Sequence, residues 1–330
     1  MRNDEIAAVI EQVATLVRTH YLFPEVGAAV ADRLIAAGSD GRYDDLTEPE
    51  QLAERMTADL QIGNDDKHLR LIYHVDELFE EDADPVAEEA AWVRRVELNA
   101  AGMARAERLA GNVGVLEIRP TLFDPKYAAA AAAGAMAMLW ATDALLLDLR
   151  GCRGGSPDMV ALVCSYLFED EPVHLNDLVT PSAGTVRQYW TVPQLVGPRF
   201  GGTKPIWVLT SSSTTFSAAE ELTYNLQQRG RAVVVGERTR GGAHPREGFT
   251  VHPHLEASVP IARAVNPMSG TNWEGVGISP DLEVPADEAF AVAYGRALDH
   301  VVGLQAGPGR REVTEEARAA LADLQIAPTS

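Results

Sequence analysis

Residues 205–229 read PIWVLTSSSTTFSAAEELTYNLQQR, and no other stretch of the sequence says more about the fold. The run PIWVLT is apolar and rich in branched side chains, as is typical of a buried strand, and it ends in a hydroxyl-rich turn. After Ser217, Leu222 and Leu226 recur at helical spacing. The stretch therefore predicts a strand, an abrupt turn and a helix.

Three further runs extend this pattern along the chain. VGVLEI and ALLLDL are each followed by a helical pattern, and AVVVGE follows the helix of the opening stretch. Strands that alternate with helices are typical of an α/β fold with a mixed, largely parallel sheet covered on both faces. In such sheets, ligands bind outside the carboxyl ends of the strands, so the turns after Leu149 and Leu209 are the places to look for chemistry.

The remaining parts of the chain read as helical or acidic segments. Apolar residues from Ile6 to Val17 recur at helical spacing, and similar patterns cover 26–37 and 48–60. The predicted organisation has four parts: an N-terminal helical domain over 1–75 that ends in the strand carrying His68, an acidic linker or helix over 76–110, an α/β catalytic core over 111–285 and C-terminal helices over 286–330.

Composition excludes several classes of protein. The 330 residues are 46% hydrophobic and 23% charged, as in an ordinary globular protein of about two domains. A net charge of −20 disfavours nucleic acids and anionic membrane surfaces as partners. Two cysteines are too few for a disulfide framework or a cysteine-based zinc site, and we expect neither metal nor cofactor. The chain start lacks a signal-peptide pattern and the run 128–140 is too short to span a membrane, so we expect a cytoplasmic protein.

Two turns contain residue types that suit nucleophilic chemistry. Ser217 at a helix start would have an exposed oxygen beside free backbone N–H groups, although Ser217 and Glu220 also have the spacing of a plain capping box. Gly154 and Gly155 follow a buried strand, where their backbone either approaches a ligand or simply permits a tight turn. Alone, neither turn distinguishes a site from ordinary structure.

A serine nucleophile needs a base, and one of the eight histidines has a suitable setting. His68 follows a Gly/Asn/Asp turn, is flanked by charge and leads into the alternating run HLRLIYH. We expect it to be mobile and accessible to solvent, as a general base must be. Glu274 stands beside Trp273 in a glycine-rich turn, where partial desolvation suits a carboxylate that orients a histidine. Taken alone, His68 fits an ordinary structural role better than a catalytic one, and Glu274 could equally be an exposed loop acid.

Taken together and in order, six segments resemble the tail-specific (C-terminal processing) serine peptidase superfamily. They are most similar to the branch that contains the tricorn protease core and the repeats of interphotoreceptor retinoid-binding protein. The segments are GNDDKHLR, GNVGVLEI, LLLDLRGCRGG, PIWVLTSSSTTFSAAEEL, RAVVVGERTRGGAHP and NWEGVGISPD. The resemblance covers most of residues 65–285 and implies a crotonase-like βαβ core preceded by a small helical domain.

The resemblance also implies roles for individual residues. It implies that Ser217 is the nucleophile, His68 the base and Glu274 the acid that orients the base. The oxyanion hole would be formed by the N–H of Ala218 and that of Gly154 or Gly155. The lysine of the family's Ser–Lys dyad is absent, since residues 240–244 read RGGAH. Lys67 stands where the tricorn group has a supporting serine, so a fourth catalytic member stays open. There is no room for a PDZ domain before the core, so substrate capture must differ.

The resemblance implies a serine hydrolase that cleaves peptide or other acyl bonds through an acyl-enzyme. Two alternatives stay open: an acyl-enzyme cyclase or transferase, and a non-catalytic protein that binds a retinoid or fatty acid. The second would use aromatic side chains to line a cleft, namely Trp190, Trp207, Phe216 and Trp273. The expected partner is a peptide or a small acyl substrate, and assembly into a homo-oligomer is left open.

Overall fold

A computed structural model of the chain describes residues 1–78, 85–305 and 307–326. The chain forms two compact units and passes between them several times. The N-terminal unit contains residues 1–91, 177–187 and 242–265, and the α/β unit contains 92–176, 188–241 and 266–330. No helix within the described ranges is both long enough and apolar enough to cross a membrane.

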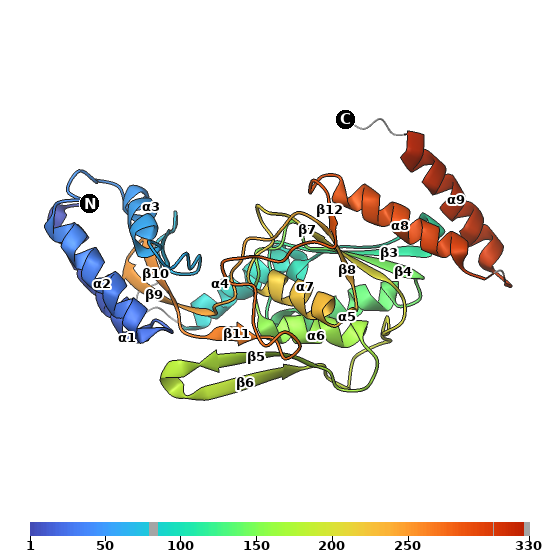
Figure 1. Ribbon diagram of the computed structural model, residues 1–330, viewed down its shortest axis with the longest axis horizontal. Helices are drawn as coiled ribbons and strands as arrows, with labels where there is room; N and C mark the ends of the chain where they lie inside the picture. Colours follow the sequence, from blue (N-terminus) through green and yellow to red (C-terminus); the bar gives the residue numbers. More distant parts are fainter. Residues whose placement is uncertain (79–84, 306, 327–330) are drawn as a thin grey trace. The chain divides into compact units, whose positions relative to one another are not determined.

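The N-terminal unit begins with three helices (Figure 1): α1 (Asn3–His20), α2 (Pro24–Ser39) and α3 (Pro49–Leu60). The periodic apolar residues of α1 are all buried, which confirms the helical pattern read from the sequence. They pack with side chains of the other two helices and of a small sheet into one core. The predicted N-terminal helical domain is thereby confirmed as a fold element.

The sheet of this unit joins segments that are far apart in the chain. Its strand order is β1 (Arg70–Tyr73), β10 (Leu255–Pro260), β9 (Arg246–His252), and both pairings are antiparallel. β9 is therefore an edge strand. A second three-stranded sheet has the order β11 (Arg263–Val265), β5 (His174–Thr180), β6 (Thr185–Trp190).

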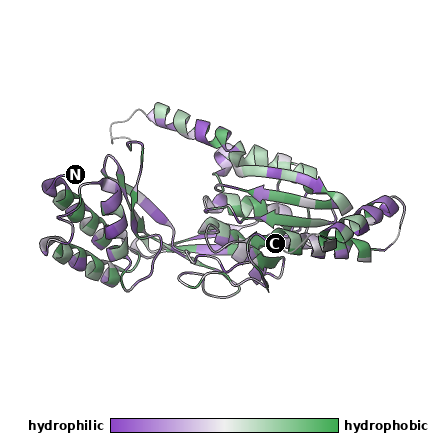
Figure 2. Cartoon of the chain, turned by 90° about the horizontal axis from the view of Figure 1, so that it is seen from above, coloured by the Kyte–Doolittle hydropathy of each residue, from purple (hydrophilic) through white to green (hydrophobic). Residues whose placement is uncertain are grey.

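The α/β unit is built on a six-stranded sheet. Its order is β12 (Leu282–Glu283), β8 (Val233–Gly236), β7 (Ile206–Thr210), β4 (Ala144–Asp148), β3 (Val113–Ile118), β2 (Met103–Leu109). Only the β2–β3 pairing is antiparallel among these described strands. Every residue of β4 and β7 is buried, and Figure 2 shows these central strands as mostly hydrophobic. The prediction of a mixed, largely parallel sheet is confirmed.

Helices cover both faces of this sheet, as Figure 1 shows. One face packs against α8 (Ala289–Gly303), and the opposite face against α5 (Pro125–Leu139), α6 (Pro157–Leu167) and α7 (Ala218–Gln228). The other helical elements are α4 (Pro85–Leu98), α9 (Arg310–Ile326) and the single turns η1 (Ala100–Gly102), η2 (Ala110–Asn112) and η3 (Pro181–Ala183). Because β4 and β7 are parallel neighbours, the turns that follow them meet at one edge of the sheet.

Candidate functional site

Ser217 occupies the turn between β7 and α7. It is the N-cap residue of α7, with φ +56° and ψ −124°, a backbone conformation that residues other than glycine rarely adopt. A residue held in this way between a buried strand and a helix start projects its side chain from the end of the sheet. Ser217 is half-buried, so the residue is only partly exposed to solvent.

The glycine turn after β4 lies against Ser217. A Cβ atom on Gly154 would come within 2.7 Å of the Ser217 Cβ and 3.1 Å of the Ala218 nitrogen, so only glycine allows this approach. The Gly154 carbonyl accepts hydrogen bonds from the Leu122 N–H at 2.7 Å and the Thr121 hydroxyl at 2.8 Å. These bonds fix the 154–155 peptide, whose N–H belongs to Gly155 and points away from the carbonyl.

The first N–H of α7 completes this arrangement. Ala218 is the first helical residue, so its N–H has no acceptor within the helix, and the positive end of the helix dipole lies at the same place. The structure therefore brings together Ser217, Ala218, Gly154 and Gly155. A serine oxygen beside a helix N-terminus and a fixed glycine peptide can support a reaction in which negative charge develops on a carbonyl oxygen.

Glu220 connects the Ser217 turn to a second loop. Its Oε2 accepts the Ser217 N–H at 2.8 Å, as the capping-box spacing predicts. Its Oε1 accepts the Thr239 hydroxyl at 2.5 Å and the Gly241 N–H at 2.6 Å, and the side chain is fully buried. A buried carboxylate with three donors is well satisfied. Through these bonds, Glu220 fixes the position of the Ser217 turn relative to the 239–241 loop.

Glu274 lies in a loop that is tied to the same network. Gly275 N–H donates to the carbonyl of Gly241 at 3.3 Å, and Glu274 N–H donates to Asn272 Oδ1 at 3.0 Å. The preceding Trp273 is only 2% exposed and its ring lies 5.2 Å from that of Tyr224. The buried indole thus anchors a loop that carries a half-buried carboxylate.

The neighbouring Glu221 has a different environment and gives a stability prediction. It is buried on α7, and burial raises its pKa to about 8, against the lowering effect of the Asn176 side chain. An unfolded glutamate titrates near pH 4.3, so between about pH 4.3 and 8 the folded state binds one proton more than the unfolded state. The free energy of unfolding therefore falls by up to ~1.4 kcal/mol for each unit that the pH rises through this window. Glu221→Gln should remove this loss.

Chemical denaturation at pH 5 and at pH 8 measures the effect. We expect Glu221→Gln to have a higher free energy of unfolding than the wild type at pH 8, with the difference shrinking toward pH 5. The exposed Glu171 provides a control, because Glu171→Gln should leave the pH dependence unchanged. A Glu221→Gln difference that is equal at both pH values would contradict the assignment.

His68 lies in the turn before β1, in the N-terminal unit. The expectation that it is accessible to solvent is wrong, because the residue is only 5% exposed. Its backbone N–H donates to Asp66 Oδ1 at 3.0 Å, and its backbone carbonyl accepts a hydrogen bond from the Ser258 hydroxyl of β10 at 2.6 Å. Burial lowers the pKa of His68 to about 3, partly opposed by the Asp66 carboxylate. The imidazole is therefore neutral at pH 7, the form that accepts a proton.

A buried polar network supports His68 from within the same unit. Asp66 is 1% exposed and accepts the Tyr21 hydroxyl at 3.0 Å. Its Oδ2 also lies 2.7 Å from Nδ1 of the buried His244. Because each added partner satisfies a buried carboxylate oxygen, the network fixes Asp66 and, through it, the backbone of His68.

The seven predicted site residues fall in both units. His68 and Lys67 belong to the N-terminal unit, and the other five, Gly154, Gly155, Ser217, Ala218 and Glu274, belong to the α/β unit. Lys67 is half-buried in the turn that carries His68.

The aromatic residues considered for an apolar cleft are mostly packing residues. Trp207 lies on β7 within the core that α8 covers, and Phe216 and Trp273 are 4% and 2% exposed. Trp190 is the exception, since it is 43% exposed at the end of β6 and stacks on the His174 ring at 4.4 Å. The side chains of Trp207, Phe216 and Trp273 therefore pack in the interior of the protein.

The sequence interpretation missed the residues that support the site. Asp66 had a local signal, since an aspartate often binds the N–H two residues ahead, and it does so here with His68. Tyr21 and His244 had no local sequence signal, because they contact Asp66 from 45 and 178 residues away along the chain. Glu220 was recognised only as a capping partner.

Comparisons with known proteins identify the family of the chain. A family model described as peptidase family S41 matches residues 113–284. A second, described as the N-terminal domain of peptidase S41 in eukaryotic IRBP, matches residues 2–103. Together they confirm the family resemblance read from the six segments.

Solved structures share the fold at low sequence identity. A photosystem II D1 C-terminal processing protease is 16% identical with a TM-score of 0.50, and covers 86% of this chain and 94% of its own. A lipoprotein from Streptococcus agalactiae is 15% identical with a TM-score of 0.56, covering 88% and 96%. The tricorn protease is 12% identical with a TM-score of 0.55, covering 98% of this chain and 37% of its own.

Proposed function

Because the chain belongs to peptidase family S41 and is a serine peptidase, we propose that Ser217, His68 and Glu274 are its catalytic triad. Ser217 is the nucleophile, His68 the general base and Glu274 the acid that orients the imidazole. Lys67, next to His68, is a candidate for a supporting fourth member. The substrates are peptides, whose amide bonds the enzyme cleaves through an acyl-enzyme.

One observation carries the proposal: the constrained Ser217 turn lies against the Gly154–Gly155 peptide. When the Ser217 oxygen attacks a carbonyl carbon, the carbonyl oxygen becomes negatively charged. The N–H groups of Ala218 and of Gly155 or Gly154 are suitable donors to that oxygen. A single donor of this kind contributes roughly 3 kcal/mol to transition-state stability.

The proposed proton transfers use the neutral imidazole of His68 as the base. The imidazole takes the Ser217 hydroxyl proton as the new C–O bond forms, and gives it to the leaving amine as the C–N bond breaks. Water then attacks the ester with His68 again as base, which releases the acid and restores the serine. Glu274 stabilises the imidazolium that exists between these steps.

The acceptor that resolves the acyl-enzyme decides the reaction type. Water gives a peptidase of the tail-specific type, whereas an amine or hydroxyl of the substrate would give a cyclic or transferred product. We favour hydrolysis because the chain belongs to a peptidase family. Cytoplasmic residence stays a prediction of the sequence.

Covalent labelling with a fluorophosphonate tests the nucleophile assignment. The reagent phosphonylates activated serines and displaces fluoride, so we expect one adduct per chain, located on Ser217 by peptide mapping. The exposed Ser213 in the same turn provides a control, because Ser213→Ala should still be labelled. An adduct on another residue, or equal labelling of Ser217→Ala, would overturn the assignment.

A further inference from the structure

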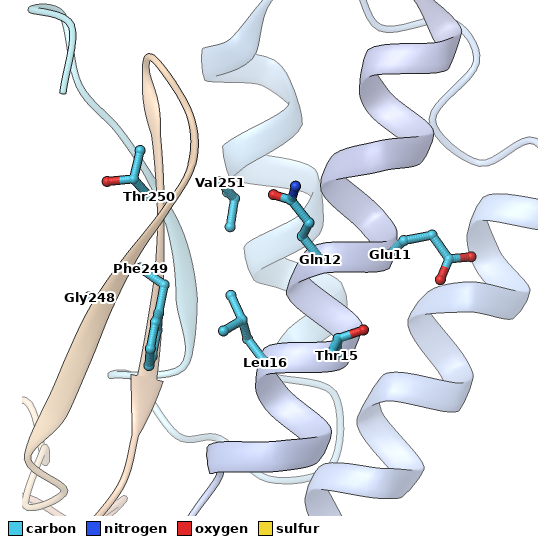
Figure 3. A pocket seen from close by; sticks show the side chains of 8 residues that line it. All are labelled: Glu11, Gln12, Thr15, Leu16, Gly248, Phe249, Thr250 and Val251. Carbon is cyan, nitrogen blue, oxygen red and sulfur yellow. The ribbon is translucent and has the colours of Figure 1, made fainter. Parts of the chain in front are cut away.

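A groove in the N-terminal unit lies along the edge of its sheet. It has a volume of about 840 Å³ and is lined by two elements, α1 and β9. The lining residues are Glu11, Gln12, Thr15 and Leu16 from α1, and residues 248–251 from β9. Figure 3 shows Gln12 and Leu16 extending from the helix toward the strand. The groove is wide enough for a ligand of several residues.

One wall of the groove is formed by β9, a strand with one unpaired edge. β9 pairs with β10 on one side only, and among the described residues no backbone hydrogen bond reaches its other side. In an antiparallel strand, alternate residues direct their N–H and C=O groups outward. The seven-residue β9 therefore offers a row of backbone donors and acceptors along the groove.

The floor of the groove is apolar and incompletely covered. Leu16, Phe249 and Val251 are only partly buried where they pack against the core of the unit. The His20 ring stacks on Phe249 at a centroid distance of 5.0 Å. A strand added beside β9 would place every second side chain over this surface, since side chains alternate along a strand.

The charge around the groove favours one class of occupant. Glu11 is exposed on the lining, and the exposed Glu247 immediately precedes the lining residues of β9. A second copy of this chain, with its net charge of −20, would bring the same acids against them. A neutral or basic polypeptide meets no such repulsion.

We propose that this groove captures an extended segment of the polypeptide substrate, which pairs with β9 as a fourth strand. The segment has apolar side chains at alternate positions, facing the partly buried surface, and Lys or Arg near Glu11. Backbone pairing provides affinity without a fixed sequence, and the alternating apolar contacts provide selectivity. The inference rests on the peptidase function only in taking the captured segment to be substrate.

Binding measured without turnover separates this inference from the catalytic proposal. The probe is a fluorescent heptapeptide with Val at alternate positions and Lys at both ends, and fluorescence anisotropy follows its binding to full-length Ser217→Ala protein. A second peptide has the same side chains, but carries N-methyl groups at alternate residues on the edge that would face β9. We expect the methylated peptide to bind at least about tenfold more weakly, because it lacks the strand-pairing donors.

Variants of the protein test the location. Gln12→Trp fills the groove and should weaken binding of the first peptide about tenfold. Glu11→Lys reverses the lining charge and should weaken it several-fold. Glu25→Lys makes the same charge change on an exposed position of α2 outside the groove and should leave binding unchanged. Circular dichroism confirms that each variant is folded.

Three results would overturn the inference. The first is equal affinity for the plain and methylated peptides. The second is unchanged binding by both Gln12→Trp and Glu11→Lys. The third is a dimer in sedimentation velocity that Gln12→Trp dissociates, which would assign the groove to a second copy of this chain. None of these results depends on whether Ser217 is the nucleophile.

Discussion

Replacing Ser217 with alanine is expected to lower kcat for peptide hydrolysis by at least about 10⁴-fold while the fold is kept. The substitution removes the proposed attacking oxygen, so the acyl-enzyme cannot form on residue 217. Alanine is smaller than serine and causes no clash. The hydrogen bond from the backbone N–H of residue 217 to Glu220 does not depend on the side chain of residue 217. Steady-state kinetics with a fluorogenic peptide measures the loss.

The same assay needs a control for the turn itself. Ser213→Ala removes an exposed hydroxyl from this turn and should change kcat by less than about twofold. Residual activity of Ser217→Ala within tenfold of the wild type would mean that another residue is the nucleophile.

Replacing Gly154 with alanine is the second large effect, expected to lower kcat by about 10²–10³-fold. The added Cβ would lie 2.7 Å from the Ser217 Cβ and 3.0 Å from the Phe216 carbonyl oxygen, so the glycine turn and the serine turn must separate. Gly154 also has φ +109°, which strains any side chain. Since the shift moves the oxyanion donors away from the serine, kcat should fall more than KM rises.

Gly230 provides a matched control for the strain. It has φ +60° at the end of α7, and a Cβ there would meet no atom within 4 Å. Gly230→Ala should therefore lose about 1 kcal/mol of stability and keep its kcat. If Gly154→Ala keeps kcat as well, the glycine turn has no part in the chemistry.

The sequence was sufficient to predict the core of the α/β unit because its central strands β4 and β7 are fully buried. Strands covered on both faces appear as continuous apolar runs, so the segments that form β4 and β7 could be recognised directly. The return of β9 and β10 to the N-terminal unit could not. β9 is largely exposed, and the pairing of β1 with β10 joins Arg70 to Ser258, for which local patterns contain no signal.

The site was predictable only in part, for a similar reason. Ser217 and Gly154 each follow an apolar strand, and parallel strand order brings such turns together. His68 was recognised by its turn, but its burial was not, because burial depends on Asp66 and on β10 behind it. A charged sequence neighbourhood says little about a side chain whose contacts come from distant segments.

The central claim is that His68 of the N-terminal unit and Ser217 of the α/β unit act on one carbonyl group. A crystal structure of the fluorophosphonate adduct tests it most directly, because the reagent mimics the tetrahedral intermediate. We expect a nitrogen of the His68 ring to lie about 2.6–3.2 Å from the Ser217 oxygen, with a Glu274 oxygen on the other ring nitrogen. A His68 ring farther from that oxygen than one bridging water can span would contradict it.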